Sequence, residues 1–195
     1  MTRGKPLSFD RDEVLEKAMD VFWEKGFSKT GMTELLERMG IQRQSFYNTF
    51  GSKEEVFLDA ITRYSRGILS RTNLILEQDR HPLENMKELF DMMRGMSETK
   101  DGCGCLLGNS IAEFGDSQDA VGELLQKQVH GLYTAFFQAF TRAVENGYIA
   151  ADKDPKVLAT SFLAMTQGMA LLSKMGFGDE MLNDVFQVTE ELLGG

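Results

Sequence analysis

The sequence predicts an all-α fold of about nine helices. Apolar residues recur three and four positions apart along nearly all of the 195 residues, whereas runs that alternate apolar and polar residues are absent. Only three prolines interrupt the chain. Apolar side chains make up 42% of it, which is enough for a packed core and argues against a disordered protein.

The first helix is predicted to begin after Asp10 and to end near Gly26. Asp10 can accept hydrogen bonds from the free amides of the first turn, and Glu13 occupies the matching position of a capping box. Gly26 is suited to a left-handed stop, because glycine adopts that conformation without steric cost.

Two short helices are expected near 32–39 and 43–49, and a glycine follows each of them. Ser52 and Glu55 form a second capping box, which opens a long helix. Helices joined by a glycine-containing turn within about 50 residues are typical of the helix-turn-helix. We therefore expect a three-helix DNA-binding domain over residues 1–52.

The remainder of the chain is predicted to form a second helical domain over residues 53–195. Asp154 and Pro155 mark one helix start in it, since proline is tolerated in the first turn behind a capping aspartate. The expected helices lie near 53–78, 82–98, 103–114, 117–146, 155–176 and 179–193.

Charge is distributed unevenly along the chain, whose formal net charge is −9. Residues 1–53 contain nine Lys and Arg against eight Asp and Glu, a net charge of +1, so residues 54–195 carry a net charge of −10. DNA repels the acidic part, and any DNA contact must use the first segment. A short basic arm with Arg3 and Lys5 is a candidate for following the DNA backbone.

The composition also restricts the compartment. No apolar run reaches the roughly 18 residues of a membrane helix, and the first residues contain no apolar signal region. Two cysteines in 195 residues do not make a disulfide framework. We expect a cytoplasmic protein that does not associate with a membrane.

The chemistry of the third helix indicates DNA reading. Phe46 and Phe50 are four residues apart and are expected to face inward, which turns the polar residues of the helix outward. Arginine pairs well with guanine in the major groove, and glutamine or asparagine with adenine. The first residues of a recognition helix usually reach base edges. Arg43 and Gln44 are therefore the expected base readers.

The segment from Gly26 to Glu54 resembles the TetR family of transcriptional regulators, and its most specific part is Phe46-Tyr47-x-x-Phe50-Gly51-Ser52-Lys53. The resemblance implies an N-terminal helix-turn-helix followed by a ligand-binding and dimerisation domain. It also implies that Tyr47 and Thr33 contact phosphates, while Lys53 lies at a helix N-terminus that favours a phosphate. The predicted DNA-binding residues are Thr33, Arg43, Gln44, Ser45, Tyr47, Asn48 and Lys53.

Two positions depart from the family pattern. Gly31 and Gln42 stand before the second and third helices, where the family often has Ser or Thr. Glycine is a tolerable cap and glutamine a poor one, which leaves the start of the recognition helix less well marked.

A homodimer is predicted, because two helix-turn-helix units about 34–36 Å apart read a palindrome in successive major grooves. The helices near 155–176 and 179–193 carry apolar residues on more than one side, for example Val157, Phe162 and Val188. The resemblance implies that they form a four-helix dimer bundle, and the alternative is that they are ordinary core.

A small-molecule site is expected among the central helices, where methionines and aromatic residues could line an adaptable cavity. Ordinary core is the alternative for most of them. The predicted ligand-binding residues are Phe90, Met93, Cys105, Asn109, Glu113, Tyr133, Phe137 and Met165.

The segment from Gly102 to Glu113 resembles the Gly-Cys-Leu-Leu-x-Asn-Ser/Thr-x-x-Glu stretch of one branch of the family, some of whose members respond to electrophiles, aldehydes or acrylate-like compounds. Cys105 is the residue that matches. Its position at a helix N-terminus favours the thiolate, which is the reactive form of cysteine. Two alternatives remain open. In the first, Cys105 is simply a small buried side chain. In the second, Cys103 and Cys105 bind a metal with His81 or His130.

These observations together predict a repressor that binds operator DNA as a dimer and leaves it when a small-molecule inducer binds. No cofactor and no catalytic residue set are expected. The alternatives are a metal- or drug-responsive regulator of the same fold, a helical enzyme and a helical interaction module.

Overall fold

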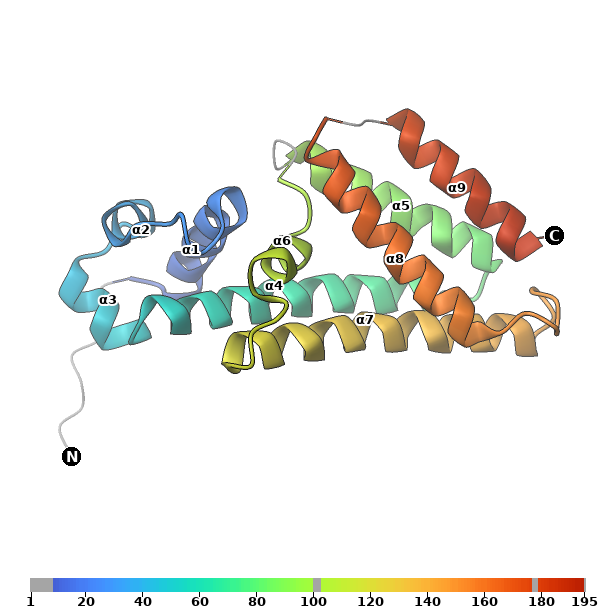
Figure 1. Cartoon of the computed structure of the whole chain (residues 1–195), viewed down its shortest axis with the longest axis horizontal. Helices are drawn as coiled ribbons and strands as arrows, with labels where there is room; N and C mark the ends of the chain where they lie inside the picture. The colour runs from blue at the N-terminus through green and yellow to red at the C-terminus, as the bar shows by residue number, and fades with distance from the viewer. Residues whose placement is uncertain (1–8, 100–102, 177–178, 195) are drawn as a thin grey trace. The chain divides into compact units, whose positions relative to one another are not determined.

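The computed structural model describes residues 9–99, 103–176 and 179–194, and over these ranges it contains nine α-helices and no strand (Figure 1). The all-α prediction is confirmed, and most helix ends lie within three residues of those expected. The predicted basic arm, Arg3 and Lys5, lies outside the described residues. The helices are α1 (Arg11–Lys25), α2 (Met32–Met39), α3 (Arg43–Phe50), α4 (Lys53–Leu76), α5 (Pro82–Thr99), α6 (Leu106–Phe114), α7 (Ala120–Glu145), α8 (Pro155–Ser173) and α9 (Asp179–Gly194).

The chain forms two compact units that divide after Tyr64, within α4. The sequence placed the boundary at residue 52, before this helix. The difference arises because the first turns of α4 belong to the core of the first unit: Phe57, for example, is 1% exposed and packs on the Phe22 ring at a centroid distance of 5.1 Å. α4 is therefore shared between the units, and it links them covalently.

Aromatic packing and ion pairs hold the first unit together. Trp23 of α1 lies edge-on to Tyr64 of α4 at 4.9 Å. On the surface, both terminal nitrogens of the Arg38 guanidinium donate to the Glu24 carboxylate, at 2.8 and 3.2 Å, and tie α2 to α1. This hydrogen bond and the attraction of the Glu24 charge raise the pKa of Arg38, so this arginine is already matched by an acid within the protein.

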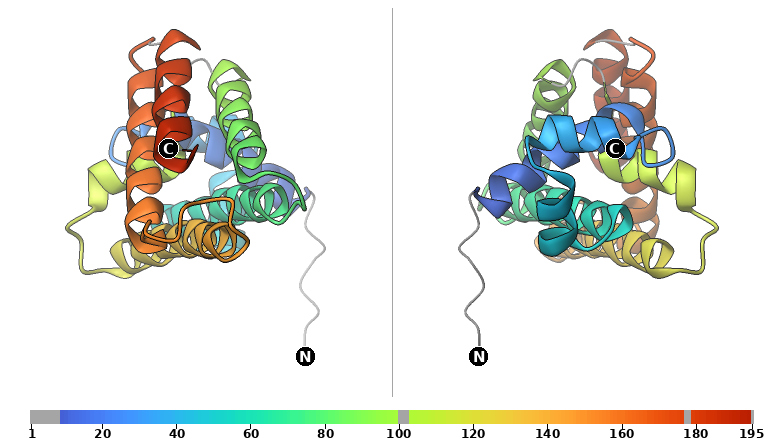
Figure 2. Two further views of the ribbon diagram at one scale, coloured as in Figure 1. Left: turned by 90° about the vertical axis from the view of Figure 1, so that its right-hand side faces the viewer. Right: turned by 90° about the vertical axis from the view of Figure 1, so that its left-hand side faces the viewer.

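The second unit is built around α7 and α8, whose contact is the most extensive among the described helix pairs. α9 lies alongside α8 (Figure 2). α6 packs against both of them, and α5 packs against α8 and α9. Phe162 of α8 is 1% exposed and contacts three other rings, Phe90 at 5.6 Å, Phe136 at 4.9 Å and Phe140 at 5.8 Å. This cluster fixes the side of α8 that faces the core.

Side-chain caps set the helix starts. Asp10 accepts from the amides of Asp12 and Glu13, and Asp154 accepts from the Lys156 amide, as predicted. α6 and α7 each begin three residues later than expected, at Leu106 and Ala120. Gly104 has a φ of +69°, which α-helix excludes, and the Asp119 side chain caps α7.

One predicted helix end differs in detail. Gly26 has φ 80° and ψ 171°, an extended conformation with positive φ rather than the left-handed helical stop that was expected. Its amide still bonds to the Phe22 carbonyl at 2.8 Å and closes α1. Glycine is required here because other residues rarely adopt such a φ.

Within the described ranges, none of the helices combines the length and the apolar character that crossing a membrane requires.

Candidate functional site

α3 is anchored from beneath by its two phenylalanines. Phe46 is fully buried and Phe50 is 5% exposed, as the sequence predicted. The Arg11 guanidinium lies 5.1 Å from the centre of the Phe50 ring and also pairs with Asp59 of α4 at 2.5 Å. α1 and α4 thus hold α3 on one side, and its other side faces solvent.

The solvent side of α3 carries the polar residues expected to read DNA. Arg43, Gln44 and Asn48 are exposed, Tyr47 is 44% exposed, and Ser45 is half-buried. The Gln44 side-chain amide donates to the Asn48 amide oxygen at 3.0 Å, so these two side chains form a single hydrogen-bonded unit.

Tyr47 is exposed but held in place. Its ring stands perpendicular to the Phe46 ring, at a centroid distance of 5.4 Å. An aromatic contact of this geometry restricts the ring while the hydroxyl remains accessible.

Polar groups on the flanking helices complete this surface. Thr33 is exposed in the first turn of α2. Lys53 at the start of α4 is half-buried, with its ammonium 4.1 Å from the centre of the Phe27 ring. The two departures from the family pattern have a structural counterpart. Neither Gly31 nor Gln42 provides a side-chain cap, so the first amides of α2 and α3 do not donate to a side chain at these N-cap positions. Helix amides of this kind bind phosphate oxygens.

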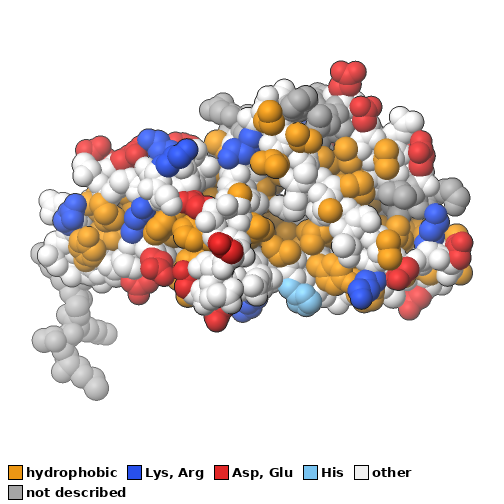
Figure 3. All heavy atoms as spheres, in the orientation of Figure 1, with side chains coloured by type: hydrophobic (Ala, Val, Ile, Leu, Met, Phe, Trp, Pro, Cys, Tyr) orange, Lys and Arg blue, Asp and Glu red, His pale blue; other side chains and the backbone are white. Residues whose placement is uncertain are grey.

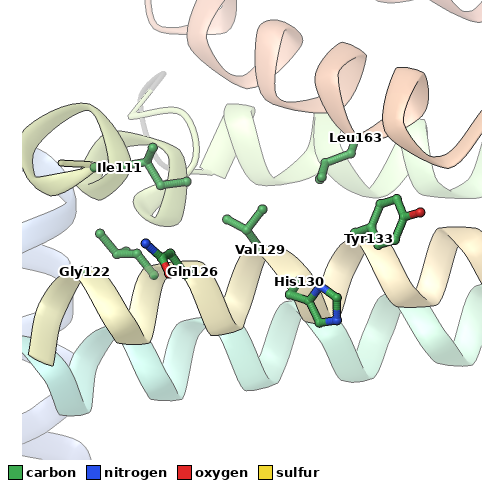
Figure 4. Close-up of a pocket in the computed structure, with 9 residues that line it drawn as sticks. Ile111, Gly122, Gln126, Val129, His130, Tyr133 and Leu163 are labelled. Carbon is green, nitrogen blue, oxygen red and sulfur yellow. The ribbon is translucent and has the colours of Figure 1, made fainter. Parts of the chain in front are cut away.

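A pocket of about 470 Å³ lies in the second unit, between α6, α7 and α8 (Figure 4). Val129 of α7 and Leu163 of α8 extend into the space between their helices. Most of the lining comes from one side of α7. The pocket is lined by Ile111, Gly115, Gly122, Leu125, Gln126, Val129, His130, Tyr133 and Leu163.

Of the eight predicted ligand-binding residues, Tyr133 alone belongs to this lining. Phe137 stacks on the far side of the Tyr133 ring at 6.1 Å and is 38% exposed. Phe90 is 3% exposed and lies in the aromatic core between Phe162 and Phe186. Met93, Glu113 and Met165 are half-buried outside the lining.

Sequence reasoning found Tyr133 but missed Gln126 and His130, the other polar residues of the pocket. Gln126 and His130 precede Tyr133 by seven and three positions on α7, which places all three on one face of the helix. That spacing was present in the sequence, but the opposing wall from α6 and α8 depends on how the helices cross.

The cysteine segment forms a closely packed corner of the second unit. Cys105 is the N-cap of α6, and its sulfur accepts a hydrogen bond from the Gly108 amide at 3.4 Å. Cys103 and Cys105 are both half-buried thiols. In the parts of the chain that the structure describes, no three His, Cys, Asp or Glu residues gather as a metal site would require.

Asn109, predicted to bind ligand, uses both ends of its amide within the protein. Its nitrogen donates to the Cys103 carbonyl at 2.9 Å, and its oxygen accepts from the Lys174 ammonium at 3.0 Å. The side chain therefore connects the cysteine segment to the turn that follows α8.

Comparison with known proteins identifies the family. The sequence model described as "Bacterial regulatory proteins, tetR family" matches residues 14–60, and that described as "Tetracyclin repressor-like, C-terminal domain" matches residues 82–187. The HTH-type transcriptional repressor ComR of Escherichia coli (strain K12) is 28% identical over 195 residues, covering 98% of this chain and 92% of the relative. The uncharacterized HTH-type transcriptional regulator YezE of Bacillus subtilis (strain 168) is 27% identical over 192 residues, covering 97% of this chain and 99% of the relative.

Solved structures agree with this assignment. A cysteine-substituted variant of the TetR family transcriptional regulator CifR, in complex with 26-bp double-strand operator DNA, has a TM-score of 0.86 and 28% identity, covering 97% of this chain and 100% of the other. These relatives are transcriptional regulators rather than enzymes, in agreement with the sequence analysis. Since family models match segments of both compact units, the chain belongs to the tetR family of bacterial regulatory proteins.

Proposed function

We propose that this regulator represses transcription by binding palindromic operator DNA as a homodimer, and that a small molecule acting on the second unit releases it. The observation that carries the proposal is the exposed polar side of α3, anchored by Phe46 and Phe50 and continued by Tyr47. The similarity to an operator-bound regulator over nearly the whole chain supports it.

The roles of the DNA-binding residues follow from their positions. Arg43 and Gln44 lie in the first turn of α3, where a recognition helix reaches base edges, and Asn48 acts through Gln44. Thr33, Tyr47 and Lys53 carry hydroxyl and ammonium groups suited to phosphate, and the half-buried Ser45 of α3 offers a further hydroxyl. Phosphate contacts of this kind position the protein. The side-chain amides of Gln44 and Asn48 and the guanidinium of Arg43 specify the sequence.

The dimer is proposed through α8 and α9. Both helices expose large apolar side chains, among them Val157 (59%), Leu171 (62%), Met175 (73%) just beyond α8, and Val188 (48%). In the space-filling view, hydrophobic side chains are exposed along α8 (Figure 3). Burial of such a surface against a second copy would remove it from water.

The test of DNA reading compares Arg43→Ala with Lys53→Ala on a duplex selected by the wild-type protein from a random library. We expect Arg43→Ala to cost about 1–3 kcal/mol of binding free energy and to relax the sequence preference, because it removes a base contact. Lys53→Ala should weaken binding to all sequences alike. It should also reduce the slope of log binding constant against log salt concentration by about 1, because one phosphate contact is lost. Two protomers should occupy each duplex.

Arg71→Ala serves as the matched control, since Arg71 is an exposed arginine in the second unit. It should leave the affinity for the selected duplex unchanged. Thermal melts of all variants check that loss of the Lys53 contact with Phe27 has not unfolded the first unit. Unchanged affinity and preference in Arg43→Ala would remove α3 from its proposed role.

For the signal, we propose that an electrophile reacts at Cys105. The segment around it packs tightly on α8: a Cβ added at Gly104 would lie 2.6 Å from the Ala170 carbonyl oxygen, and one at Gly108 would lie 2.9 Å from the side-chain oxygen of Gln167. An adduct on Cys105 therefore has little free volume beside it and would displace α6 relative to α8. Because α8 is a proposed dimer helix, this displacement would alter the pairing of protomers.

A further inference from the structure

The pocket between α6, α7 and α8 is separate from the cysteine segment, since neither cysteine contributes to its lining. We propose that it binds a neutral, ring-containing organic molecule reversibly, without reaction at Cys105. The proposal deepens the proposed function and rests on it, because it gives the regulator a non-covalent small-molecule site.

The size of the pocket suits such a ligand. Its volume of about 470 Å³ lies within the roughly 300–1,000 Å³ typical of small-molecule sites. Leu125 is 2% exposed and Gly122 is buried, whereas Gln126 and His130 are exposed. The apolar residues thus form the floor, and the polar ones stand nearer to solvent.

Charge determines the class of ligand. Among the lining residues there is no Asp, Glu, Lys or Arg. A charged molecule bound against this wall would lose hydration without gaining an ion pair, which opposes its binding. Gln126, His130 and the Tyr133 hydroxyl offer hydrogen bonds to a neutral ligand that carries a polar atom.

A fixed aromatic surface favours a ring. Tyr133 lies between two other rings on α7, His130 at 6.1 Å with an interplanar angle of 28° and Phe137 at 6.1 Å with an angle of 8°. The stack holds the Tyr133 ring in one orientation before a ligand arrives. Because His130 and Phe137 stack on it, the preoriented Tyr133 ring offers its edge to a ligand ring, and edge-to-face contact is an arrangement that aromatic pairs favour.

The backbone is closely packed at the end of the pocket formed by Gly115 and Gly122. A Cβ at Gly115 would lie 2.6 Å from the Ile111 carbonyl oxygen, and a Cβ at Gly122 would collide with the Ser117 carbonyl. The connection between α6 and α7 is therefore closely packed. Both glycines line the pocket, so a bound molecule would contact backbone that has little room to yield.

The experiment is a fluorescence titration of the full chain with N-phenyl-1-naphthylamine, a neutral two-ring probe that brightens in apolar sites. The matched charged probe is 8-anilinonaphthalene-1-sulfonate, which has the same ring system and a sulfonate. We expect saturable binding of the neutral probe at one site per protomer, and at least about tenfold weaker binding of the sulfonate.

Two glutamine variants on α7 locate the site. Gln126→Trp fills the lining and should weaken the neutral probe at least about tenfold, whereas Gln138→Trp, at an exposed position outside the lining, should not change its affinity. Cys105→Ser should also bind the probe like wild type. Equal probe binding by Gln126→Trp and wild type, equal affinity for the two probes, or loss of binding in Cys105→Ser would overturn the proposal.

The affinity of the same proteins for the selected duplex, measured without probe, separates this inference from the proposed function. Failure of the wild-type protein to bind DNA while it binds the probe would reject the repressor role and leave the pocket assignment standing. DNA binding without saturable probe binding would reject the pocket assignment and leave the repressor role standing.

Discussion

At the residue scale, the DNA-reading surface depends on pairs of side chains more than on single ones. Gln44 donates one amide hydrogen to Asn48, which fixes both amide groups before DNA arrives. The second hydrogen and the oxygen of Gln44 remain for a base, and so do the hydrogens of Asn48. This arrangement presents a donor and an acceptor together, which matches the edge of adenine.

A double-mutant cycle tests this pairing. Gln44→Ala and Asn48→Ala should each weaken binding to the selected duplex by about 1–3 kcal/mol. The double variant should weaken it by at least about 0.5 kcal/mol less than the sum, because each single change already disrupts the other side chain. Fluorescence anisotropy with labelled duplex measures all four affinities.

The control cycle combines Gln44→Ala with Thr33→Ala, since Thr33 lies on α2, a different helix from the one that carries Gln44 and its partner Asn48. Its effects should add to within about 0.5 kcal/mol. Additive effects in the Gln44 and Asn48 cycle as well would show that the two amides act separately on DNA.

At the element scale, α7 depends on the cap at its N-terminus. The Asp119 carboxylate accepts from the amides of Val121 at 2.9 Å and Gly122 at 3.2 Å. The hydrogen bond with Ser117 and then these backbone bonds lower the pKa of Asp119 below its ordinary value of 3.8. Since α7 supplies most of the pocket lining, this cap supports the proposed ligand site.

The lowered pKa predicts a pH-dependent contribution to stability. A carboxylate whose pKa is lower in the folded state stabilises the fold above the unfolded pKa, near 3.8, and loses that contribution as the pH falls through the folded pKa. Asp119→Ala should therefore melt below wild type at pH 7, and the difference should shrink as the pH is lowered below about 3.8. Thermal unfolding followed by circular dichroism measures both.

Asp116→Ala, an exposed aspartate in the same connection, is the control and should show no such pH-dependent difference. A melting difference for Asp119→Ala that stays constant from pH 7 to the acid range would mean that the carboxylate charge does not contribute to the cap.

The helices themselves were largely predictable from sequence, and the pocket was not. Caps such as Asp10 and Asp154, and the inward spacing of Phe46 and Phe50, are local features that neighbouring residues determine. The lining of the pocket depends on the crossing of α6, α7 and α8, which no local pattern encodes. Asn109 shows why local patterns do not predict such a site. The sequence suggested that its side-chain amide binds a ligand, but in the fold its oxygen accepts from Lys174, 65 positions along the chain.

At the scale of the whole molecule, a signal in the second unit can reach α3 through the helix that joins the units covalently. α4 supplies that connection, because it begins at Lys53 beside the DNA-reading surface and continues as a helix to Leu76. Its last carbonyl accepts from Arg142 of α7 at 3.2 Å, so α4 is tied to the helix that packs on α6 and α8. A ligand shifts the DNA-binding equilibrium only as far as it binds the two conformations unequally.

An electrophile that reacts with Cys105 should release this regulator from DNA. N-ethylmaleimide should add to Cys105, forming a carbon–sulfur bond while the thiol proton passes to the neighbouring ring carbon. The adduct must enter the closely packed corner beside Gly104 and Gly108, and α6 can accept it only by moving on α8. Affinity for the selected duplex should fall at least about tenfold, or about 1.4 kcal/mol, in wild type and in Cys103→Ser, and stay unchanged in Cys105→Ser. Mass spectrometry establishes which cysteine has reacted. Equal loss of DNA from Cys105→Ser and wild type would exclude Cys105 as the sensor, and a modified Cys105 in protein that still holds DNA would show that this corner does not communicate with α3.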